Sequence, residues 1–190
     1  MIIKIHGTSG SGKTTIIREL MKMSDPVPAE CVDLKEGKVE AMILHLPGVM
    51  KPVVALGPYG KAHCGGLDAI SGTDVHAALL HRYVTWGHVI YEGLLGSECY
   101  GAMGIASERY HGDHLFAFLD TPIEICIDRV KQRRLDAGNT KPLNEANTRG
   151  RVAKINRLKY RLNNEFDRWV FDLDHLRATQ QIYELLRNAT

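Results

Sequence analysis

Residues 7–14 read GTSGSGKT, and this stretch decides the fold because it matches the pattern GxxxxGK[ST] in full. The apolar run IIKIH (residues 2–6) in front of it predicts a strand. Residues 13–23 behind it predict an amphipathic helix. A glycine-rich turn between a strand and a helix is the setting in which this pattern holds the phosphates of a nucleotide. We therefore expect a phosphate-binding loop, or P-loop, at residues 7–14.

The residue types in this loop suit a triphosphate and a metal ion. Glycines let backbone N–H groups converge on phosphate oxygens without Cβ clashes, and the helix N-terminus adds partial positive charge. Lys13 can reach the β- and γ-phosphates, the Thr14 hydroxyl can ligate Mg²⁺, and Thr15 is placed for the α-phosphate. The residues expected to bind ATP here are Gly7, Ser9, Gly10, Ser11, Gly12, Lys13, Thr14 and Thr15.

The composition is that of one globular domain over residues 1–190. Of the residues 44% are hydrophobic and 24% charged, and no apolar run approaches the ~20 residues of a membrane helix. The four cysteines, Cys31, Cys64, Cys99 and Cys126, show no CxxC spacing, which favours reduced thiols over metal or disulfide roles. We expect a cytoplasmic protein with no membrane partner.

Short β-type runs alternate with helical runs, which predicts an α/β fold with a mostly parallel sheet. Together with the P-loop, this pattern indicates a three-layer P-loop NTPase fold, with a five-stranded sheet and helices on both faces. Residues 30–46 are less regular and read as a β-hairpin insert. The five expected core strands are residues 2–6, 53–57, 88–93, 115–120 and 169–173.

Two later helices carry clear signals. The sequence Thr121-Pro122-Ile123-Glu124 fits a capping box, and Gly138 fits a helix stop. The helix expected over residues 148–168 has an apolar stripe that ends near Trp169, which we expect in the core together with Trp86. Its adjacent face carries four cations: Lys154, Arg157, Arg161 and Arg168.

Positive charge is concentrated in residues 129–168. This segment holds twelve Lys and Arg residues against four Asp and Glu, a net charge of +8, whereas the whole chain carries only +2. The remaining residues therefore carry −6. Such a basic block indicates an anionic partner: nucleotide phosphates, nucleic acid, or both.

The class of P-loop protein is narrowed by what surrounds the loop. The chain has neither the NKxD motif nor the DxxG switch of a GTPase, which argues against that class. Motor ATPases usually have an acidic pair at the end of the strand that corresponds to residues 88–93. Here a single acid, Glu92, is found near that end, which argues against a motor ATPase. In this architecture that position faces Mg²⁺ and the substrate hydroxyl. Glu92 could hold a metal-bound water or accept the hydroxyl proton.

The glycine-rich loop at residues 57–66 lies on the substrate side, because ligands bind beyond the carboxyl ends of parallel strands. Tyr59 could stack on a base, and Lys61 could contact phosphate. Asp68 could read a base edge or act as the catalytic base in place of Glu92. Arg109 is a weaker candidate for a substrate phosphate.

The stretch DTPIEICIDRVKQRR (residues 120–134) resembles the lid helix of the nucleoside and nucleotide kinase group of P-loop proteins. The resemblance implies a lid over about residues 133–151 that closes over ATP and excludes water. It also implies that Arg129 stacks on the adenine and that Arg133 acts catalytically on the phosphates. The further phosphate candidates it implies are Arg134, Arg149 and Arg151.

Two longer stretches narrow the resemblance. PVVALGPYGKAHCGGLDAISG (residues 52–72) and HVIYEGLLGS (residues 88–97) look like the kinases of bacterial viruses that hypermodify thymine in their DNA. That family implies transfer of the ATP γ-phosphoryl group to 5-hydroxymethyluracil already in DNA, in the host cytoplasm. The family commonly has an arginine where this chain has Pro58.

Other functions remain open from the sequence. A kinase of a free nucleoside, nucleotide or other small hydroxyl substrate needs the same P-loop and Glu92, but not a long basic surface. A non-enzymatic, ATP-gated binding module would bind ATP without transferring its phosphate. A motor ATPase would need a partner arginine and an oligomer.

Overall fold

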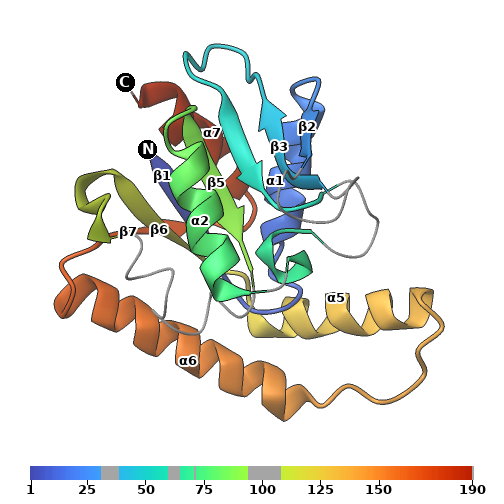
Figure 1. Ribbon diagram of the computed structural model, residues 1–190. Coiled ribbons are helices and arrows are strands. Elements are labelled where there is room, and N and C mark those ends of the chain that lie inside the picture. Colours follow the sequence, from blue (N-terminus) through green and yellow to red (C-terminus); the bar gives the residue numbers. More distant parts are fainter. Residues whose placement is uncertain (31–38, 60–64, 71, 94–107, 190) are drawn as a thin grey trace.

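The structure, a computed structural model, describes residues 1–30, 39–59, 65–70, 72–93 and 108–189. In these residues strands and helices alternate along the chain (Figure 1). The strands are β1 (Ile2–His6), β2 (Val27–Glu30), β3 (Val39–Leu44), β4 (Val53–Leu56), β5 (His88–Glu92), β6 (His114–Leu119) and β7 (Trp169–Leu173). The α-helices are α1 (Lys13–Lys22), α2 (Thr73–Tyr83), α5 (Ile123–Asp136), α6 (Glu145–Asn164) and α7 (Ala178–Asn188), with short 3₁₀ helices η1 (Leu67–Ala69) and η2 (His111–Asp113).

The described strands form one seven-stranded sheet in the order β2-β3-β4-β5-β1-β6-β7. The five strands from β4 to β7 run parallel, as expected for an α/β fold. The expected total of five strands is wrong, because β3 pairs antiparallel with β4, and β2 antiparallel with β3. Only β3 lies fully within the expected hairpin at residues 30–46, because β2 overlaps it at Glu30 alone, and both strands extend the sheet itself. Residues 31–38, with the expected turn, lie outside the described residues.

Helices cover both faces of the sheet. On one face, α1 and α7 pack on the strands through Ile17 and Ile182, both fully buried. On the other face, α2 covers the β4–β5 side, and α6 covers β6 through Leu158 and Leu162. Figure 1 shows α5 lying alongside α6 at one end of the sheet. This gives three layers, with α5 outside them at the carboxyl ends of the strands.

The P-loop lies where the parallel strands end. β1 sits between β5 and β6, and its residue Ile5 is in register with Glu92 and with Ala117. The chain leaves β1 at His6 and enters α1 at Lys13, so the loop spans the middle of the sheet. A ligand in a parallel sheet binds at this edge. The topology therefore brings the P-loop, Glu92 and the ends of β6 and β7 together.

Several sequence expectations about single residues are wrong. Thr121 does not cap α5, because its hydroxyl donates to the Ser11 carbonyl oxygen at 2.8 Å instead. Trp86 and Trp169 are not core residues, since 54% and 48% of their surfaces are exposed. Arg168 is buried and so does not lie on the exposed basic face of α6. The stop at Gly138 is confirmed, because its φ of +71° is the left-handed conformation that ends a helix.

The outer edge of the sheet carries a proline. β2 is the edge strand beyond β3, and Pro28 lies in its middle, opposite Met42. Proline has no backbone N–H, and edge strands are where it is tolerated in a sheet. Among the described helices, none combines the length and the apolarity needed to cross a membrane.

A buried carboxylate ties the hairpin to the rest of the domain. Glu40 of β3 is 1% exposed and accepts hydrogen bonds from the Tyr83 hydroxyl at 2.5 Å and from Arg82 Nη1 at 2.8 Å, both on α2. We expect Tyr83→Phe to lower the free energy of unfolding by about 1.5–3 kcal/mol, because a buried charge loses a donor. Urea denaturation measures this change.

Tyr160→Phe is the matched control, since the same hydroxyl is removed from a side chain that is 64% exposed. It should change the free energy of unfolding by less than about 0.5 kcal/mol. Equal effects of the two substitutions would show that Glu40 does not depend on Tyr83.

Candidate active site

The P-loop is shaped by glycines and by its contact with α5. Gly10 and Gly12 have φ values of +81° and +107°, which favour glycine. A Cβ on Gly10 would lie only 2.3 Å from the carbonyl oxygen of Cys126 on α5. Together with the hydrogen bond from Thr121 to Ser11, this close approach fixes the loop against the start of α5.

The Lys13 side chain lies inside the P-loop, where it is expected to bind phosphate. Its side chain is buried, and Nζ donates to the carbonyl oxygens of Gly7 at 2.8 Å and Thr8 at 3.0 Å. Burial lowers the pKa of Lys13, and the nearby Glu92 carboxylate acts in the opposite direction. A buried ammonium bonded only to neutral carbonyls is well suited to bind an anion.

Glu92 and Thr14 face each other across the site. The Thr14 hydroxyl donates to Glu92 Oε1 at 2.8 Å. Burial raises the pKa of Glu92, while Lys13 and the hydrogen bond from Thr14 lower it. A hydroxyl and a carboxylate at this distance are the hard oxygen ligands that Mg²⁺ prefers. These residues therefore fit a magnesium ion at the position expected from the sequence.

The described end of the glycine-rich loop packs against Glu92. Gly66 has a φ of +70°, and a Cβ there would lie 2.6 Å from Glu92 Oε1. A Cβ on Gly57 would lie 2.4 Å from the Gly66 backbone, so the two glycines let the loop close over the end of β5. This packing carries Asp68 of η1 to the same cavity as Glu92.

One cavity of about 590 Å³ contains most of the expected site residues. The predicted site residues in its wall belong to the P-loop, the two candidate bases and two arginines of α5. They are Ser9, Gly10, Ser11, Gly12, Lys13, Thr14, Thr15, Asp68, Glu92, Arg129 and Arg133. Arg129 also donates from Nη1 to the Gly10 carbonyl oxygen at 3.3 Å. The volume is in the range of small-ligand sites.

Two substrate-side candidates lie outside the cavity wall. Tyr59 is 3% exposed within the core that packs on α1, so its ring offers no open face to a base. Burial raises the pKa of its hydroxyl strongly. Arg109 is exposed in a turn before η2 and does not line the cavity. Lys61 lies outside the described residues.

The other lid arginines are also outside the cavity. Arg149 pairs with Glu124 through two hydrogen bonds of 2.8 and 3.0 Å, which join the starts of α6 and α5. The pKa of Glu124 is lowered by this hydrogen bond. Arg134 and Arg151 are likewise absent from the described cavity wall. Of the five candidate arginines on α5 and α6, Arg129 and Arg133 therefore line the cavity that contains the P-loop.

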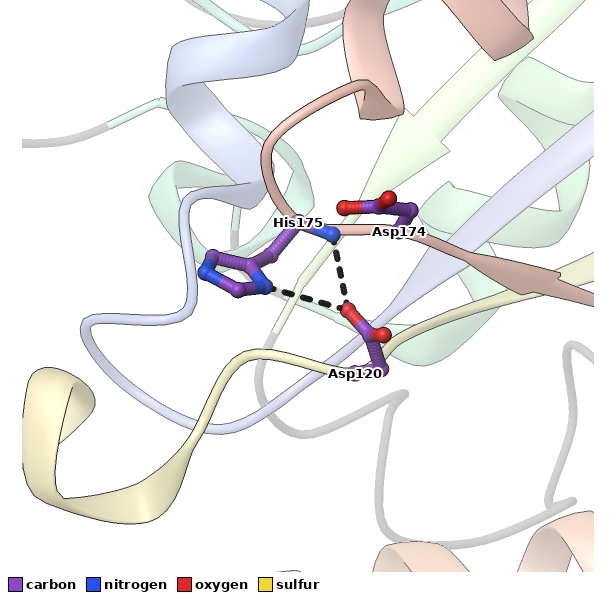
Figure 2. A group of neighbouring side chains, drawn as sticks. All are labelled: Asp120, Asp174 and His175. Atoms are coloured by element: carbon purple, nitrogen blue, oxygen red, sulfur yellow. Dashed lines mark hydrogen bonds and ion pairs between the residues drawn. The ribbon is translucent and has the colours of Figure 1, made fainter.

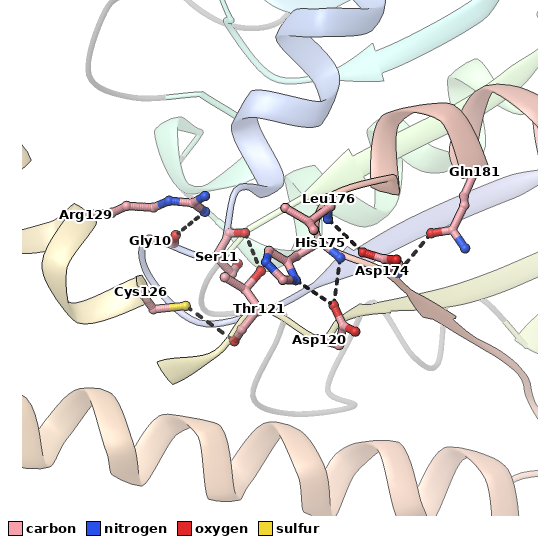
Figure 3. Close-up of polar contacts among 10 residues, drawn as sticks. All are labelled: Gly10, Ser11, Asp120, Thr121, Cys126, Arg129, Asp174, His175, Leu176 and Gln181. Carbon is pink, nitrogen blue, oxygen red and sulfur yellow. Dashed lines mark hydrogen bonds and ion pairs between the residues drawn. The ribbon is translucent and has the colours of Figure 1, made fainter. Parts of the chain in front are cut away.

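A second polar cluster borders the cavity and was missed from the sequence. Figure 2 shows that Asp120, Asp174 and His175 point toward one another from the ends of β6 and β7. Asp120 Oδ1 accepts hydrogen bonds from the His175 backbone N–H at 2.7 Å and from His175 Nδ1 at 3.3 Å. Asp174 Oδ1 accepts from the Leu176 N–H at 2.9 Å, as Figure 3 shows. The only sequence signal was that both strands are followed by aspartate.

This cluster has the ligand types of a cation site, because the three side chains each offer one atom within 4.8 Å of the others. Both aspartates, however, accept hydrogen bonds from backbone N–H groups of the β7–α7 loop. The cluster is therefore explained as the anchor of that loop. His175 and Leu176 of the same loop line the same cavity as Arg129.

Comparison with known proteins identifies relatives of this chain. The chain is 36% identical over 152 residues to a 5-hmdU DNA kinase of Pseudomonas phage PaMx11, a match that covers 77% of each chain. It is 30% identical to a 5-hmdU DNA kinase of Pseudomonas phage M6, over 69% of this chain and 71% of the relative.

A solved structure of deoxyadenosine kinase from M. mycoides with bound dATP aligns with 99% of this chain and 98% of its own, at 16% identity and a TM-score of 0.43. This likeness carries no conclusion about substrate. The sequence model of the family described as 5-hmdU DNA kinase matches residues 1–166. The chain therefore belongs to the 5-hmdU DNA kinase family.

Proposed function

We propose that this chain transfers the γ-phosphoryl group of ATP to the hydroxymethyl oxygen of 5-hydroxymethyluracil in DNA, a step in the hypermodification of thymine in phage DNA. Family membership supports the kinase reaction and its acceptor. The observation that carries the mechanism is the single cavity in which Lys13, Thr14 and Glu92 meet.

The triphosphate of ATP binds to the P-loop in this proposal. Lys13 Nζ leaves its carbonyl partners at Gly7 and Thr8 for the β- and γ-phosphate oxygens, since charged oxygens bind an ammonium more strongly than neutral ones. Thr14 would ligate Mg²⁺ and Glu92 would hold a water of the ion, and the ion would neutralise charge on the phosphates.

Glu92 also acts as the general base for the acceptor hydroxyl group in this proposal. Its carboxylate accepts the proton of the hydroxymethyl group while the acceptor oxygen attacks the γ-phosphorus. The bond from that phosphorus to the β,γ-bridging oxygen breaks, and ADP leaves. A positioned base helps a primary hydroxyl, but alignment and charge neutralisation supply most of the rate enhancement. Asp68 is the alternative base, because it lines the same cavity.

Arg133 lines the same cavity and supplies positive charge there in this proposal. It lies on the last turns of α5, next to the loop at residues 137–144 that joins α5 to α6. We place the lid at about residues 133–151, so that its closure brings Arg133 to the γ-phosphate and excludes water. Arg129, whose Nη1 donates to the Gly10 carbonyl oxygen, stacks on the adenine in this proposal.

DNA binds along α6 in this proposal. Lys154, Arg157 and Arg161 are exposed on one side of this helix, away from its buried residues Ile155, Leu158 and Leu162. A DNA strand needs a track of cations, whereas a free nucleotide needs only a few. The target base reaches the cavity from a single strand or by extrusion from the duplex.

Substitution of Glu92 tests the base. We expect Glu92→Gln to lower kcat by tenfold or more with little change in the affinity for ATP, because the amide cannot accept the proton. The raised pKa of Glu92 also predicts that wild-type activity falls as the pH drops through a value above that of an ordinary glutamate. Steady-state kinetics measure both. Full activity of Glu92→Gln would assign the base role to Asp68, for which Asp68→Asn is the comparison.

Substitution of Arg133 tests the lid. Arg133→Ala should lower kcat by about 10- to 100-fold and change the KM for ATP little, because its charge acts in the transition state. The matched control is Arg187→Ala, which removes an exposed arginine from the end of α7. If Arg133→Ala is as active as the control, Arg133 has no role in phosphoryl transfer.

DNA binding separates this function from that of a free-nucleotide kinase. We expect labelled phosphate to appear in DNA that contains 5-hydroxymethyluracil, and not in unmodified DNA or in the free nucleotide. The double variant Lys154→Ala, Arg157→Ala should lower the slope of log affinity against log salt by about 2, without changing ATP affinity. Lys22→Ala, an exposed lysine of α1, serves as control. Preference for the free nucleotide, with no effect of the double variant, would favour the small-substrate kinase.

A further inference from the structure

The cavity wall contains two chemically different groups of side chains. Lys13, Thr14 and Glu92 suit a triphosphate. His175 and the highly exposed Leu176, both in the β7–α7 loop, line the same cavity. A nucleotide whose phosphates occupy the P-loop has its base elsewhere along this wall. One part of that wall is the loop that leaves the carboxyl end of β7.

His175 is held in one orientation in this loop. Its backbone N–H and its ring Nδ1 both bond to the same carboxylate oxygen of Asp120. The loop is fixed further by Asp174, which accepts from the Leu176 N–H at 2.9 Å and donates its own N–H to Gln181 Oε1 at 2.9 Å. Only 17% of the His175 side chain is exposed. The ring is thus anchored before any base binds.

This anchor also determines which ring nitrogen carries the proton. An ionised carboxylate can only accept hydrogen bonds, so Nδ1 must be the protonated nitrogen of a neutral His175. Nε2 then carries a lone pair and acts as an acceptor. No partner of Nε2 is found among the described residues, and the ring lines the cavity.

We propose that His175 Nε2 accepts a hydrogen bond from the exocyclic amino group of the donor purine, and that Asp120, by fixing the ring and its tautomer, makes the enzyme select ATP over GTP. Adenine carries an amino donor at position 6, where guanine carries a carbonyl acceptor. With GTP two acceptors face each other, and neither is satisfied. The inference rests on the proposed function only in placing a nucleotide in this cavity.

Equilibrium binding without DNA tests the inference separately from phosphoryl transfer. Three nucleotides are compared by calorimetry with Mg²⁺: ATP, purine riboside 5′-triphosphate, which lacks the 6-amino group, and GTP. Wild type should bind ATP about 5- to 10-fold more tightly than purine riboside triphosphate, the value of one net hydrogen bond. GTP should bind at least tenfold more weakly than ATP.

His175→Phe keeps an aromatic ring of similar size but has no nitrogen. It should weaken ATP binding until ATP and purine riboside triphosphate are equal, while leaving the affinity for purine riboside triphosphate within about twofold. A role in packing alone would weaken all three nucleotides together. Leu176→Ala is the matched control in the same loop, and it should lower all three affinities by a similar factor.

Asp120→Asn keeps the shape of the anchor and serves as a second variant should His175→Phe not fold. Because its amide can also donate to Nδ1, the tautomer is no longer fixed, and the preference for ATP over purine riboside triphosphate should become smaller. The inference would be overturned if either folded variant kept the wild-type preference for ATP over purine riboside triphosphate. It would also be overturned if the wild type bound all three nucleotides equally. Tight, amino-dependent ATP binding without any transfer to DNA would instead reject the proposed function alone.

Discussion

The buried charges of Lys13 and Glu92 constrain the whole site. Removing an ammonium and a carboxylate from water costs several kcal/mol for each ion, so each must find compensation nearby. Lys13 finds it in the carbonyl oxygens of Gly7 and Thr8, and Glu92 finds it in the Thr14 hydroxyl. The register of β1 with β5 places Glu92 beside the loop. A triphosphate with its metal ion supplies opposite charge to both groups at once.

Close backbone packing connects the P-loop to α5 and Glu92 to the glycine-rich loop. Gly10 touches the first turn of α5, and Gly66 touches Glu92, in both cases at distances that admit no Cβ. Gly10 is therefore in direct contact with the helix that carries Arg129 and Arg133. In the proposed mechanism, a movement of α5 on lid closure would act directly on the P-loop.

The sequence predicted best what depends on short segments. β1, the P-loop and α1 follow from one continuous motif, and the parallel strands follow from short apolar runs. The number of strands was missed, because nothing in the hairpin sequence shows whether it pairs with the sheet or stands apart. Thr121 was misassigned for a similar reason: the capping pattern is local, whereas its actual acceptor, Ser11, is 110 residues away. Asp120 and His175 are 55 residues apart, and only the parallel pairing of β6 with β7 brings them together.

The proline in the edge strand has a consequence for assembly. An unpaired strand edge invites another chain to add to the sheet through main-chain hydrogen bonds. At β2, Pro28 has no N–H to offer to such a chain. The ladder of main-chain hydrogen bonds would therefore be interrupted at this residue. The same hairpin that widens the sheet also ends it with a strand that is poorly suited to pair with another chain.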